Sequence, residues 1–211
     1  MSERNLIKKH SNVVEYSDLS VDTNVCAGID EVGRGPLAGP VIAAAVVLGD
    51  KFEWADLRDS KALTAKRREI LAERIKENSL GWSIGRCEVD EIDEFNIFNA
   101  SLLAMRRAYD GLDLPLAMAL VDGKYSPELS VTSYAVIKGD QYVPAISAAS
   151  ILAKVTRDQE MTELDGSYPH YGFAKHKGYP TAQHIEALQQ HGPCSHHRRS
   201  FKPVAKIINE T

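Results

Sequence analysis

The chain has 211 residues, of which 44% are hydrophobic and 26% charged, a composition typical of a soluble globular protein with one sizeable core. No apolar run approaches the ~20 residues that span a bilayer, and the N-terminus lacks the hydrophobic core of a secretion signal. Three widely spaced cysteines argue against a disulfide framework or a zinc site and favour a reducing, cytoplasmic setting.

The net charge of −4 is unevenly distributed along the chain. Residues 166–211 contain six Lys or Arg and two Glu, so this segment carries +4 and the remainder carries −8. A basic segment beside an acidic body suits an enzyme that grips an anion and binds metal cations. On charge alone, however, ordinary solvated surface is the favoured interpretation.

Three strands and one helix are predicted in the first half of the chain, after a polar, loosely held extension. The strands are Val25–Ile29, Val41–Leu48 and Trp82–Cys87, and the second is apolar throughout, as in a strand buried on both faces. The segment Thr64–Asn78 is rich in helix formers and is predicted as a helix with Thr64 as its N-cap.

The second half of the chain alternates helices with strands. A long helix is predicted from an apolar face whose residues are spaced by three and four and which Gly111 ends: Phe95, Phe98, Leu102, Met105 and Tyr109. The remaining predictions are strands at 116–121 and 131–137, a helix at 147–165 capped by Ser147, and a helix at 181–191. This order predicts an α/β domain with a mixed sheet and a small C-terminal helical piece.

Acidic residues follow three of the predicted strands, close to glycines. Asp30 and Glu31 follow the first strand, whereas Asp122 and Asp140 follow two later ones. Ligand sites in α/β proteins gather at strand ends, so these acids are candidates for one site. Neighbouring residues of a strand point to opposite faces, so Asp30 and Glu31 share a site only if the strand ends there and turns at Gly33.

Four converging carboxylates would repel one another, and hard divalent cations such as Mg²⁺ or Mn²⁺ would relieve this repulsion because they prefer oxygen ligands. Two such ions about 3.5–4 Å apart would clamp a phosphodiester, activate water and stabilise the leaving oxygen. The alternative for any single acid is that it forms a turn or is merely solvated.

The same stretch offers a second interpretation as a dinucleotide-binding loop. Residues 33–38 fit the pattern G-x-G-x-x-G/A, and Glu53 lies at the spacing of the ribose-binding acid. That fingerprint requires a helix to begin at the glycines, whereas the following segment, 40–48, is predicted as a strand. The dinucleotide alternative is therefore disfavoured.

Over residues 25–204 the chain resembles bacterial type 2 ribonuclease H, and the matching motifs are long and in order. They are GIDEVGRGPLAGPVIAAAV at 28–46, LRDSKALTAKRRE at 57–69, EIDEFNIFNASLLAM at 91–105, LVDGK at 120–124, VIKGD at 136–140, ISAASILAKVTRD at 146–158, YGFAKHKGYPTAQH at 171–184 and HHRRSFKPV at 196–204.

The resemblance implies a ribonuclease H-like fold, with a mixed five-stranded sheet flanked by helices and a small C-terminal helical segment. We expect a polar extension at 1–20, a catalytic domain at 21–165, and a basic helical segment at 166–211 that completes the substrate site. The implied activity is endonucleolytic hydrolysis of RNA in RNA–DNA hybrids, including cutting 5′ of a single ribonucleotide in duplex DNA. The products would carry 3′-hydroxyl and 5′-phosphate ends.

The family's functional residues map onto this sequence position by position. Its metal ligands fall on Asp30, Glu31, Asp122 and Asp140, which would hold two Mg²⁺ or Mn²⁺ ions with the substrate.

The resemblance also implies residues that read the substrate. Gly33, Arg34 and Gly35 would contact the ribonucleotide 2′-hydroxyl, which marks RNA. Tyr179 would stack on the following deoxyribose and sense the 2′-hydroxyl, and its presence favours type 2 over the related type 3 enzymes.

Further substrate contacts are expected from four residues. Lys61 resembles a phosphate-contacting lysine, and Arg198 belongs to a basic patch expected to face nucleic acid. Lys154 and Ser147 lie in another family motif, where Ser147 either contacts the substrate or caps and packs.

The expected partners are RNA–DNA hybrids and DNA containing ribonucleotides, without a membrane, for a chain that nothing requires to be more than a monomer. The sequence identifies no partner in the replication or transcription machinery. Two alternatives from other classes are a nicotinamide dinucleotide oxidoreductase and a noncatalytic hybrid-binding module.

Overall fold

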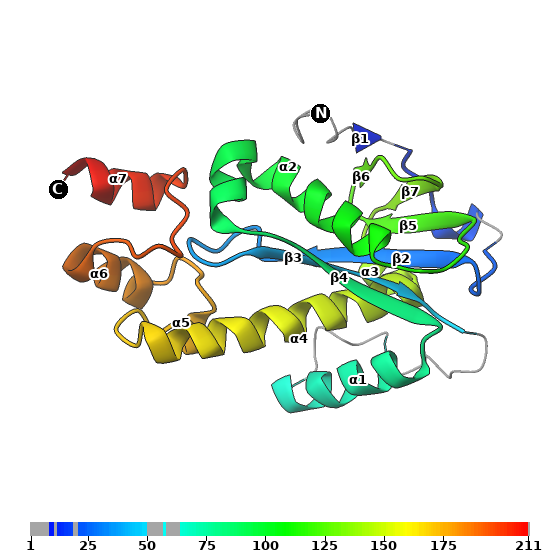
Figure 1. The fold of residues 1–211 in the computed structure, drawn as a ribbon, viewed down its shortest axis with the longest axis horizontal. Coiled ribbons are helices and arrows are strands. Elements are labelled where there is room, and N and C mark those ends of the chain that lie inside the picture. The colour runs from blue at the N-terminus through cyan, green and yellow to red at the C-terminus, as the bar shows by residue number, and fades with distance from the viewer. Residues whose placement is uncertain (1–8, 11, 19–20, 50–56, 58–63, 211) are drawn as a thin grey trace.

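The computed structural model describes residues 9–10, 12–18, 21–49, 57 and 64–210. Its centre is a five-stranded sheet with the strand order β4-β3-β2-β5-β7 (Figure 1). The strands are β2 (Cys26–Val32), β3 (Val41–Val47), β4 (Gly81–Cys87), β5 (Met118–Asp122) and β7 (Thr132–Val136). Strands β2, β3 and β4 are antiparallel neighbours, whereas β2, β5 and β7 run parallel. The predicted mixed five-stranded sheet is confirmed.

Helices cover both faces of this sheet, which explains why β3 is apolar throughout. Helix α2 (Val89–Asp110) lies on one face, and α1 (Ala65–Asn78) and α4 (Pro144–Ser167) lie on the other (Figure 1). Because side chains alternate along a strand, Val41, Ala43, Ala45 and Val47 pack in the core on the α2 side. The intervening residues Ile42, Ala44 and Val46 pack with α1 and α4.

A glycine lets the start of α4 approach the central strand closely. A Cβ atom at Gly28 of β2 would lie 2.2 Å from the carbonyl carbon of Ala145, which no side chain tolerates. The N-terminal part of α4 is therefore pressed against β2, two residues before Asp30, and this contact places the helix beside the candidate acids.

Two predicted helix starts are confirmed by their capping hydrogen bonds. The Thr64 hydroxyl accepts a hydrogen bond from the Arg67 amide at 3.4 Å, and the Thr181 hydroxyl accepts one from the His184 amide at 3.3 Å. The second of these begins α6 (Ala182–His191), which ends before Gly192 as predicted.

The predicted start of α4 at Ser147 is wrong. The helix begins at Pro144, a residue that suits the first turn because its missing N–H needs no partner there. Ser147 is buried one turn inside the helix, and its hydroxyl donates a hydrogen bond to the Leu57 carbonyl at 2.7 Å. This contact supports the packing alternative for Ser147 and leaves the side chain unable to reach a substrate.

Helix α2 is not one straight helix, although its apolar spacing predicts one. Asn96 has a φ of 65° and a ψ of 160°, so the chain leaves the helical conformation there and re-enters it. The Asn96 side-chain oxygen accepts hydrogen bonds from the amides of Phe98 (3.0 Å) and Asn99 (3.2 Å), as an N-cap does. Asparagine tolerates this backbone conformation better than most residues.

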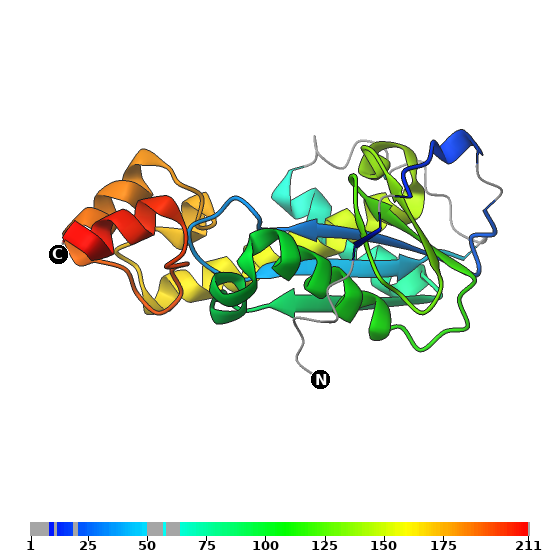
Figure 2. The same cartoon turned by 90° about the horizontal axis from the view of Figure 1, so that it is seen from above.

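The C-terminal segment gathers at one end of the sheet (Figure 1, Figure 2). Its helices are α5 (Phe173–His176), α6 and α7 (Lys202–Glu210). Their core includes Leu37 and Ala38 from the loop between β2 and β3, together with Phe173, Leu188 and Val204. We call this loop, residues 33–40, the glycine-rich loop. The C-terminal segment therefore holds the glycine-rich loop as part of its own hydrophobic core.

The described part of the N-terminal extension packs on the opposite end of the sheet, rather than being loosely held. Strand β1 (Lys9–His10) pairs with β6 (Ser126–Pro127). The Val14 amide donates to the carbonyl of Ala135 at 3.1 Å. Ala135 lies in β7, an edge strand of the sheet, so this contact covers part of that edge. Among the helices described, none is both long and apolar enough to cross a membrane.

Candidate active site

The four candidate acids lie in the three parallel strands or just after them: Asp30 and Glu31 in the second half of β2, Asp122 as the last residue of β5, and Asp140 after β7. In the sheet register Ile29 of β2 lies beside Val121 of β5, so Asp30 and Asp122 are the next residues on neighbouring strands. Asp140 lies in the short helix α3 (Gly139–Tyr142) after β7, and its amide donates to the Asp122 carboxylate at 3.2 Å. Parallel strands thus bring together acids that are up to 110 residues apart in the chain.

Repulsion and burial both act on these acids. Burial raises the pKa of Asp30 well above its usual value, and the negative charges of Glu31 and Asp122 raise it further. Hydrogen bonds from the Ser150 hydroxyl and the Glu31 amide (2.7 Å) act in the opposite direction. Ser150 lies in the same motif as Ser147 and Lys154, where the sequence leaves substrate contact and packing equally open and does not indicate a bond to Asp30.

Glu31 is also buried near another negative charge, but one cation compensates it in part. Burial and the charge of Asp122 raise the pKa of Glu31, while the Arg34 guanidinium at 3.4 Å lowers it. The first strand was predicted to end at Ile29, but β2 continues to Val32, so Glu31 still belongs to the strand. The negative charge of Asp122 therefore acts on both Asp30 and Glu31, although no chain turn lies between these two residues.

The donor set suits hard divalent cations, because it consists of crowded carboxylate oxygens. In the described part of the chain, no three Asp, Glu, His or Cys side chains already form a group that could hold a metal ion. Such a site needs further oxygens from water or from a phosphate, as is usual for Mg²⁺.

The glycine-rich loop and Tyr179 lie against each other beside the acids. A Cβ atom on Gly35 would contact the Tyr179 ring at 3.4 Å, and both residues are exposed. Gly33 has a φ of 98°, and a Cβ there would lie 2.4 Å from Nε of Arg157. Arg34 connects the glycine-rich loop to the candidate acids, because its guanidinium contacts Glu31.

The prediction that Arg198 contacts the substrate is wrong, because its side chain is fully buried. Its guanidinium donates hydrogen bonds to five backbone carbonyls of the glycine-rich loop: Gly33 (2.6 Å), Arg34 (3.2 Å), Pro36 (2.8 Å), Gly39 (2.7 Å) and Pro40 (3.2 Å). Burial lowers the pKa of Arg198, and the positive charge of nearby Arg157 lowers it further. Sequence position alone cannot distinguish a basic surface residue from this one.

A second buried arginine, which sequence reasoning missed, supports the far side of the same loop. Arg157 of α4 donates to the carbonyls of Pro40 (3.0 Å), Ala38 (3.0 Å) and Lys177 (3.0 Å). It thereby joins α4, the glycine-rich loop and the segment that precedes Tyr179. Its position inside an otherwise apolar helical face is the signal that could have revealed it.

A line of buried histidines supports the backbone of Tyr179. The Tyr179 carbonyl can only accept, so Nδ1 of His184, at 3.0 Å, carries the hydrogen of that ring. His184 Nε2 must then accept from His197 Nε2 at 3.0 Å, which leaves His197 Nδ1 to accept from the Cys194 amide at 3.0 Å. Both histidines are therefore neutral, and each is held in one tautomer.

Burial is the main cause of the neutral state of this pair. It lowers the pKa of His197 to about 3 and also lowers the pKa of His184. For His197 the neighbouring rings of His184, His196 and His170 act in the same direction, and for His184 the ring of His176 does. From the sequence, His196 and His197 are assigned with Arg198 to a basic patch facing nucleic acid, whereas the structure buries His197. His184 was not a candidate.

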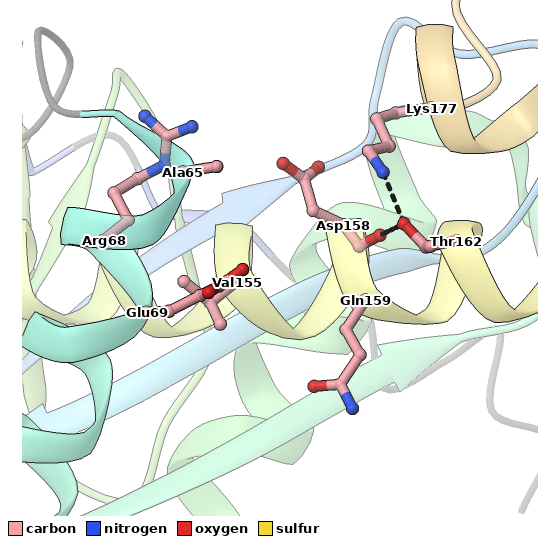
Figure 3. A pocket seen from close by; sticks show the side chains of 8 residues that line it. All are labelled: Ala65, Arg68, Glu69, Val155, Asp158, Gln159, Thr162 and Lys177. Atoms are coloured by element: carbon pink, nitrogen blue, oxygen red, sulfur yellow. Dashed lines mark hydrogen bonds between the residues drawn. The ribbon is translucent and has the colours of Figure 1, made fainter.

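Two predicted substrate contacts remain, Lys61 and Lys154. Lys61 lies outside the described residues. Lys154 forms an ion pair with Asp158 at 2.6 Å. The Asp158 carboxylate lines a cavity of about 350 Å³ between α1 and α4, which Arg68, Glu69 and Lys177 also line (Figure 3). This cavity contains charges of both signs and includes none of the four candidate acids.

One aromatic contact near the acids was predicted only as core. Phe98 is partly exposed, and its ring meets that of Tyr125 edge to face at 5.3 Å. The Arg34 guanidinium carbon lies 6.0 Å from the centre of the Phe98 ring. Phe98 also packs against the core on the α2 side, so the predicted core position holds, and the exposed part of its ring is what the sequence spacing does not indicate.

Comparison with known proteins covers nearly the whole described chain. The family model for ribonuclease HII matches residues 27–204. The chain is 58% identical over 182 residues to ribonuclease HII of Aliivibrio fischeri, which covers 86% of this chain and 88% of the relative. It is 57% identical to ribonuclease HII of Vibrio parahaemolyticus, with 86% of each chain covered.

Solved structures show the same fold. Ribonuclease H2 from Pyrococcus horikoshii is 29% identical, with a TM-score of 0.76 over 88% of this chain and 97% of that one. Ribonuclease HII in the PCNA complex from Archaeoglobus fulgidus is 28% identical, with a TM-score of 0.70 over 86% of this chain and 96% of that one. A ribonuclease HIII bound to Mn²⁺ is 17% identical, with a TM-score of 0.66 over 88% of this chain and 69% of that one, which bears on the fold alone.

Proposed function

The chain belongs to the ribonuclease HII family and is a ribonuclease H, and we propose that it also cuts 5′ of single ribonucleotides embedded in duplex DNA. Cleavage would leave 3′-hydroxyl and 5′-phosphate ends. The coarser activity, endonucleolytic hydrolysis of RNA in RNA–DNA hybrids, follows from membership of the family. The finer one concerns how the chain selects the position of the cut.

One observation carries the proposal: the residues suited to reading a sugar contact the residues suited to holding metal. Gly35 lies against the Tyr179 ring, and Arg34, between the two glycines, contacts Glu31 at 3.4 Å. Backbone amides at glycines approach a 2′-hydroxyl without steric hindrance, and an aromatic ring packs on a sugar face. A ribonucleotide read by this pair would have its phosphodiester next to the acids.

We further propose that Asp30, Glu31, Asp122 and Asp140 hold two divalent cations, Mg²⁺ or Mn²⁺, together with the substrate. When bound, these cations would supply the charge that activates water and stabilises the leaving oxygen. The chain's own part is to hold the acids close together and in register. Neighbouring parallel strands position Asp30 and Asp122, and the Asp140 amide orients the Asp122 carboxylate.

Three labelled duplexes test the proposal with the purified full chain: an RNA–DNA hybrid, a DNA duplex containing one ribonucleotide, and an all-DNA duplex. With Mg²⁺ or Mn²⁺ we expect cleavage of the first two and none of the third. Mapping the ends of the second product identifies the cut bond. Cleavage of the hybrid without cleavage at the single ribonucleotide would refute the finer proposal.

The same assay addresses the two alternatives from the sequence. A noncatalytic hybrid-binding module would shift the hybrid in a gel and leave it intact with either metal. A nicotinamide dinucleotide oxidoreductase would bind neither duplex and would quench or shift the fluorescence of the reduced cofactor. The glycines lead into the strand β3 and not into a helix, which already argues against the dinucleotide loop.

A further inference from the structure

The buried side chain of Arg198 determines which way the exposed turn of the glycine-rich loop faces. Its guanidinium accepts no hydrogen bond and donates to the Gly33 carbonyl at 2.6 Å and the Arg34 carbonyl at 3.2 Å. Two consecutive carbonyls therefore point into the protein, although Arg34 and Gly35 are themselves exposed. Without an internal donor, exposed carbonyls would be free to turn toward water.

The geometry of the peptide bond then places two amides on the outer side. In a planar trans peptide, the carbonyl of one residue and the N–H of the next point in opposite directions, and no peptide here is cis. The inward carbonyls of Gly33 and Arg34 thus direct the N–H groups of Arg34 and Gly35 outward. Among the described residues, neither of these amides has an acceptor.

The outward amides face the region that Tyr179 and Glu31 border. Gly35 lies under the Tyr179 ring, and the Arg34 side chain reaches Glu31. A cation bonded to the carbonyl of a peptide polarises it, so its N–H becomes a stronger donor. Arg198 therefore both aims and strengthens a pair of donors that have no acceptor within the described part of the chain.

We propose that Arg198 is a positioning residue that holds the Arg34 and Gly35 amides as a preformed donor pair for the 2′-oxygen of the ribonucleotide. This inference rests on the proposed recognition of single ribonucleotides. It assigns to a side chain that never touches substrate the task of distinguishing ribose from deoxyribose. The +1 charge alone is not sufficient, because a lysine ammonium has three donors and lacks the guanidinium fork that reaches five carbonyls.

Arg157 provides a matched control for loss of a buried arginine. It is also fully buried and also donates to three carbonyls, but these belong to Ala38, Pro40 and Lys177. None of them precedes an outward amide of the exposed turn. Arg157→Lys should therefore lower the melting temperature much as Arg198→Lys does but reduce discrimination less, because it leaves the bonds from Arg198 to the Gly33 and Arg34 carbonyls in place.

The experiment measures binding discrimination rather than activity. Dissociation constants of wild type, Arg198→Lys and Arg157→Lys are measured for a duplex with one ribonucleotide and for the matched all-DNA duplex. Ca²⁺ replaces Mg²⁺ to keep the substrate intact, and a gel of the same samples verifies that it is. For Arg198→Lys we expect the ratio of the two constants to fall about tenfold, as for loss of one well-placed hydrogen bond, with all-DNA binding unchanged.

Chemical rescue adds a second readout. Free guanidinium chloride, below denaturing concentration, should restore part of the ratio in Arg198→Ala, because the planar cation fits the vacated cavity. The same concentration of sodium chloride should not. A general loss of stability would not respond selectively to guanidinium.

The outcomes separate this inference from the proposed function. If wild type binds the two duplexes equally, the proposed recognition of single ribonucleotides fails. If wild type discriminates and Arg198→Lys discriminates equally well, only the role of Arg198 fails. An equal loss in Arg157→Lys, or an Arg198→Lys chain that does not fold even in the cold, would also overturn it, since the side chain would then serve general stability.

Discussion

At the scale of single residues, a proton and a metal ion compete for the same buried oxygens. Burial and neighbouring negative charge raise the pKa values of Asp30 and Glu31, so each binds a proton more readily than an exposed acid. A group whose pKa is raised in the folded state destabilises the fold once pH exceeds its unfolded value. In the metal-free protein, repulsion between these buried carboxylates therefore destabilises the fold at neutral pH. A divalent cation would relieve this electrostatic strain.

Asp122→Asn should separate this strain from the activity. The substitution removes the charge that acts on both Asp30 and Glu31, while the amide oxygen can still accept from the Asp140 amide. We expect cleavage to fall by at least about 100-fold and hybrid binding to persist, because one metal ligand is lost. The metal-free variant should melt a few degrees higher than wild type, by roughly 1 kcal/mol.

Cleavage assays and thermal melting in EDTA check both parts of this prediction. Mg²⁺ should raise the melting temperature of wild type at pH 8 and have less effect on Asp122→Asn. Near wild-type cleavage by the variant would show that Asp122 is not a metal ligand. A lower melting temperature in EDTA would instead show that its charge is not in conflict with the other two.

Tyr179 is expected to contribute through its ring rather than its hydroxyl. The ring is 41% exposed and lies against Gly35, whereas no hydrogen bond of the hydroxyl is needed for that contact. Tyr179→Ala should reduce kcat/KM at a single ribonucleotide by about 10–100-fold, in line with a lost stacking contact of 1–3 kcal/mol, and affect a long hybrid less. Tyr179→Phe should remain within about threefold of wild type. Equal losses on both substrates would remove Tyr179 from junction recognition.

At the scale of elements, the pair His184 and His197 makes the C-terminal segment sensitive to acid. A depressed folded pKa means that the unfolded chain binds protons at higher pH than the folded chain does. Stability is therefore complete above the unfolded value of about 6.5 and is lost as pH falls below it, down to the folded value of about 3 for His197. At pH 5 His197 alone should cost about 2 kcal/mol.

His197→Gln tests this pH dependence. The variant should be less stable than wild type at pH 7.5, because its neighbours lose a hydrogen bond, but its stability should decline less between pH 7.5 and 5. The raised pKa values of Asp30 and Glu31 act in the opposite sense and are common to both proteins, so the difference between them isolates His197. Urea unfolding at several pH values measures it, and parallel pH profiles would refute the assignment.

The elements also show what could be read from the sequence. Strand alternation and helix caps are local, so Thr64, Thr181 and the sheet strands were predicted to within a few residues. The kink at Asn96 was not, because a side chain that caps its own helix mid-way leaves the apolar spacing intact. The start of α4 was misplaced because Ser147 is as common in packed helices as at caps.

The candidate site also contains some residues that the sequence predicts and others that it does not. Acids at the ends of predicted strands are visible in the sequence, and parallel pairing of β2, β5 and β7 explains why they converge. Arg198 could not be recognised, because its function depends on carbonyls more than 100 residues away in the chain. For Arg157 the apolar helical face around it indicates burial but not the carbonyls that it binds. Buried polar contacts of this kind are set by tertiary structure and have no sequence period.

At the scale of the whole molecule, Asp93 links α2 to the C-terminal segment. It lies in α2, on one face of the sheet, and its carboxylate accepts from the amides of Arg199 (2.8 Å) and Ser200 (3.0 Å) and from the Ser200 hydroxyl. These residues directly follow Arg198, which holds the glycine-rich loop. One carboxylate thus couples α2, the C-terminal segment and the loop between β2 and β3.

Asp93→Ala should therefore weaken both stability and substrate selection. Loss of hydrogen bonds to a charged acceptor costs about 2 kcal/mol, which corresponds to a melting temperature roughly 4–8 °C lower for a chain of this size. Because the amides of Arg199 and Ser200 then lose their common acceptor, we expect KM for a duplex with one ribonucleotide to rise more than kcat falls. Asp93→Asn, which keeps one acceptor oxygen without the charge, should show about half the loss of stability. If Asp93→Ala melts like wild type and its KM is unchanged, the C-terminal segment is held by its hydrophobic core alone, and the loop does not depend on α2.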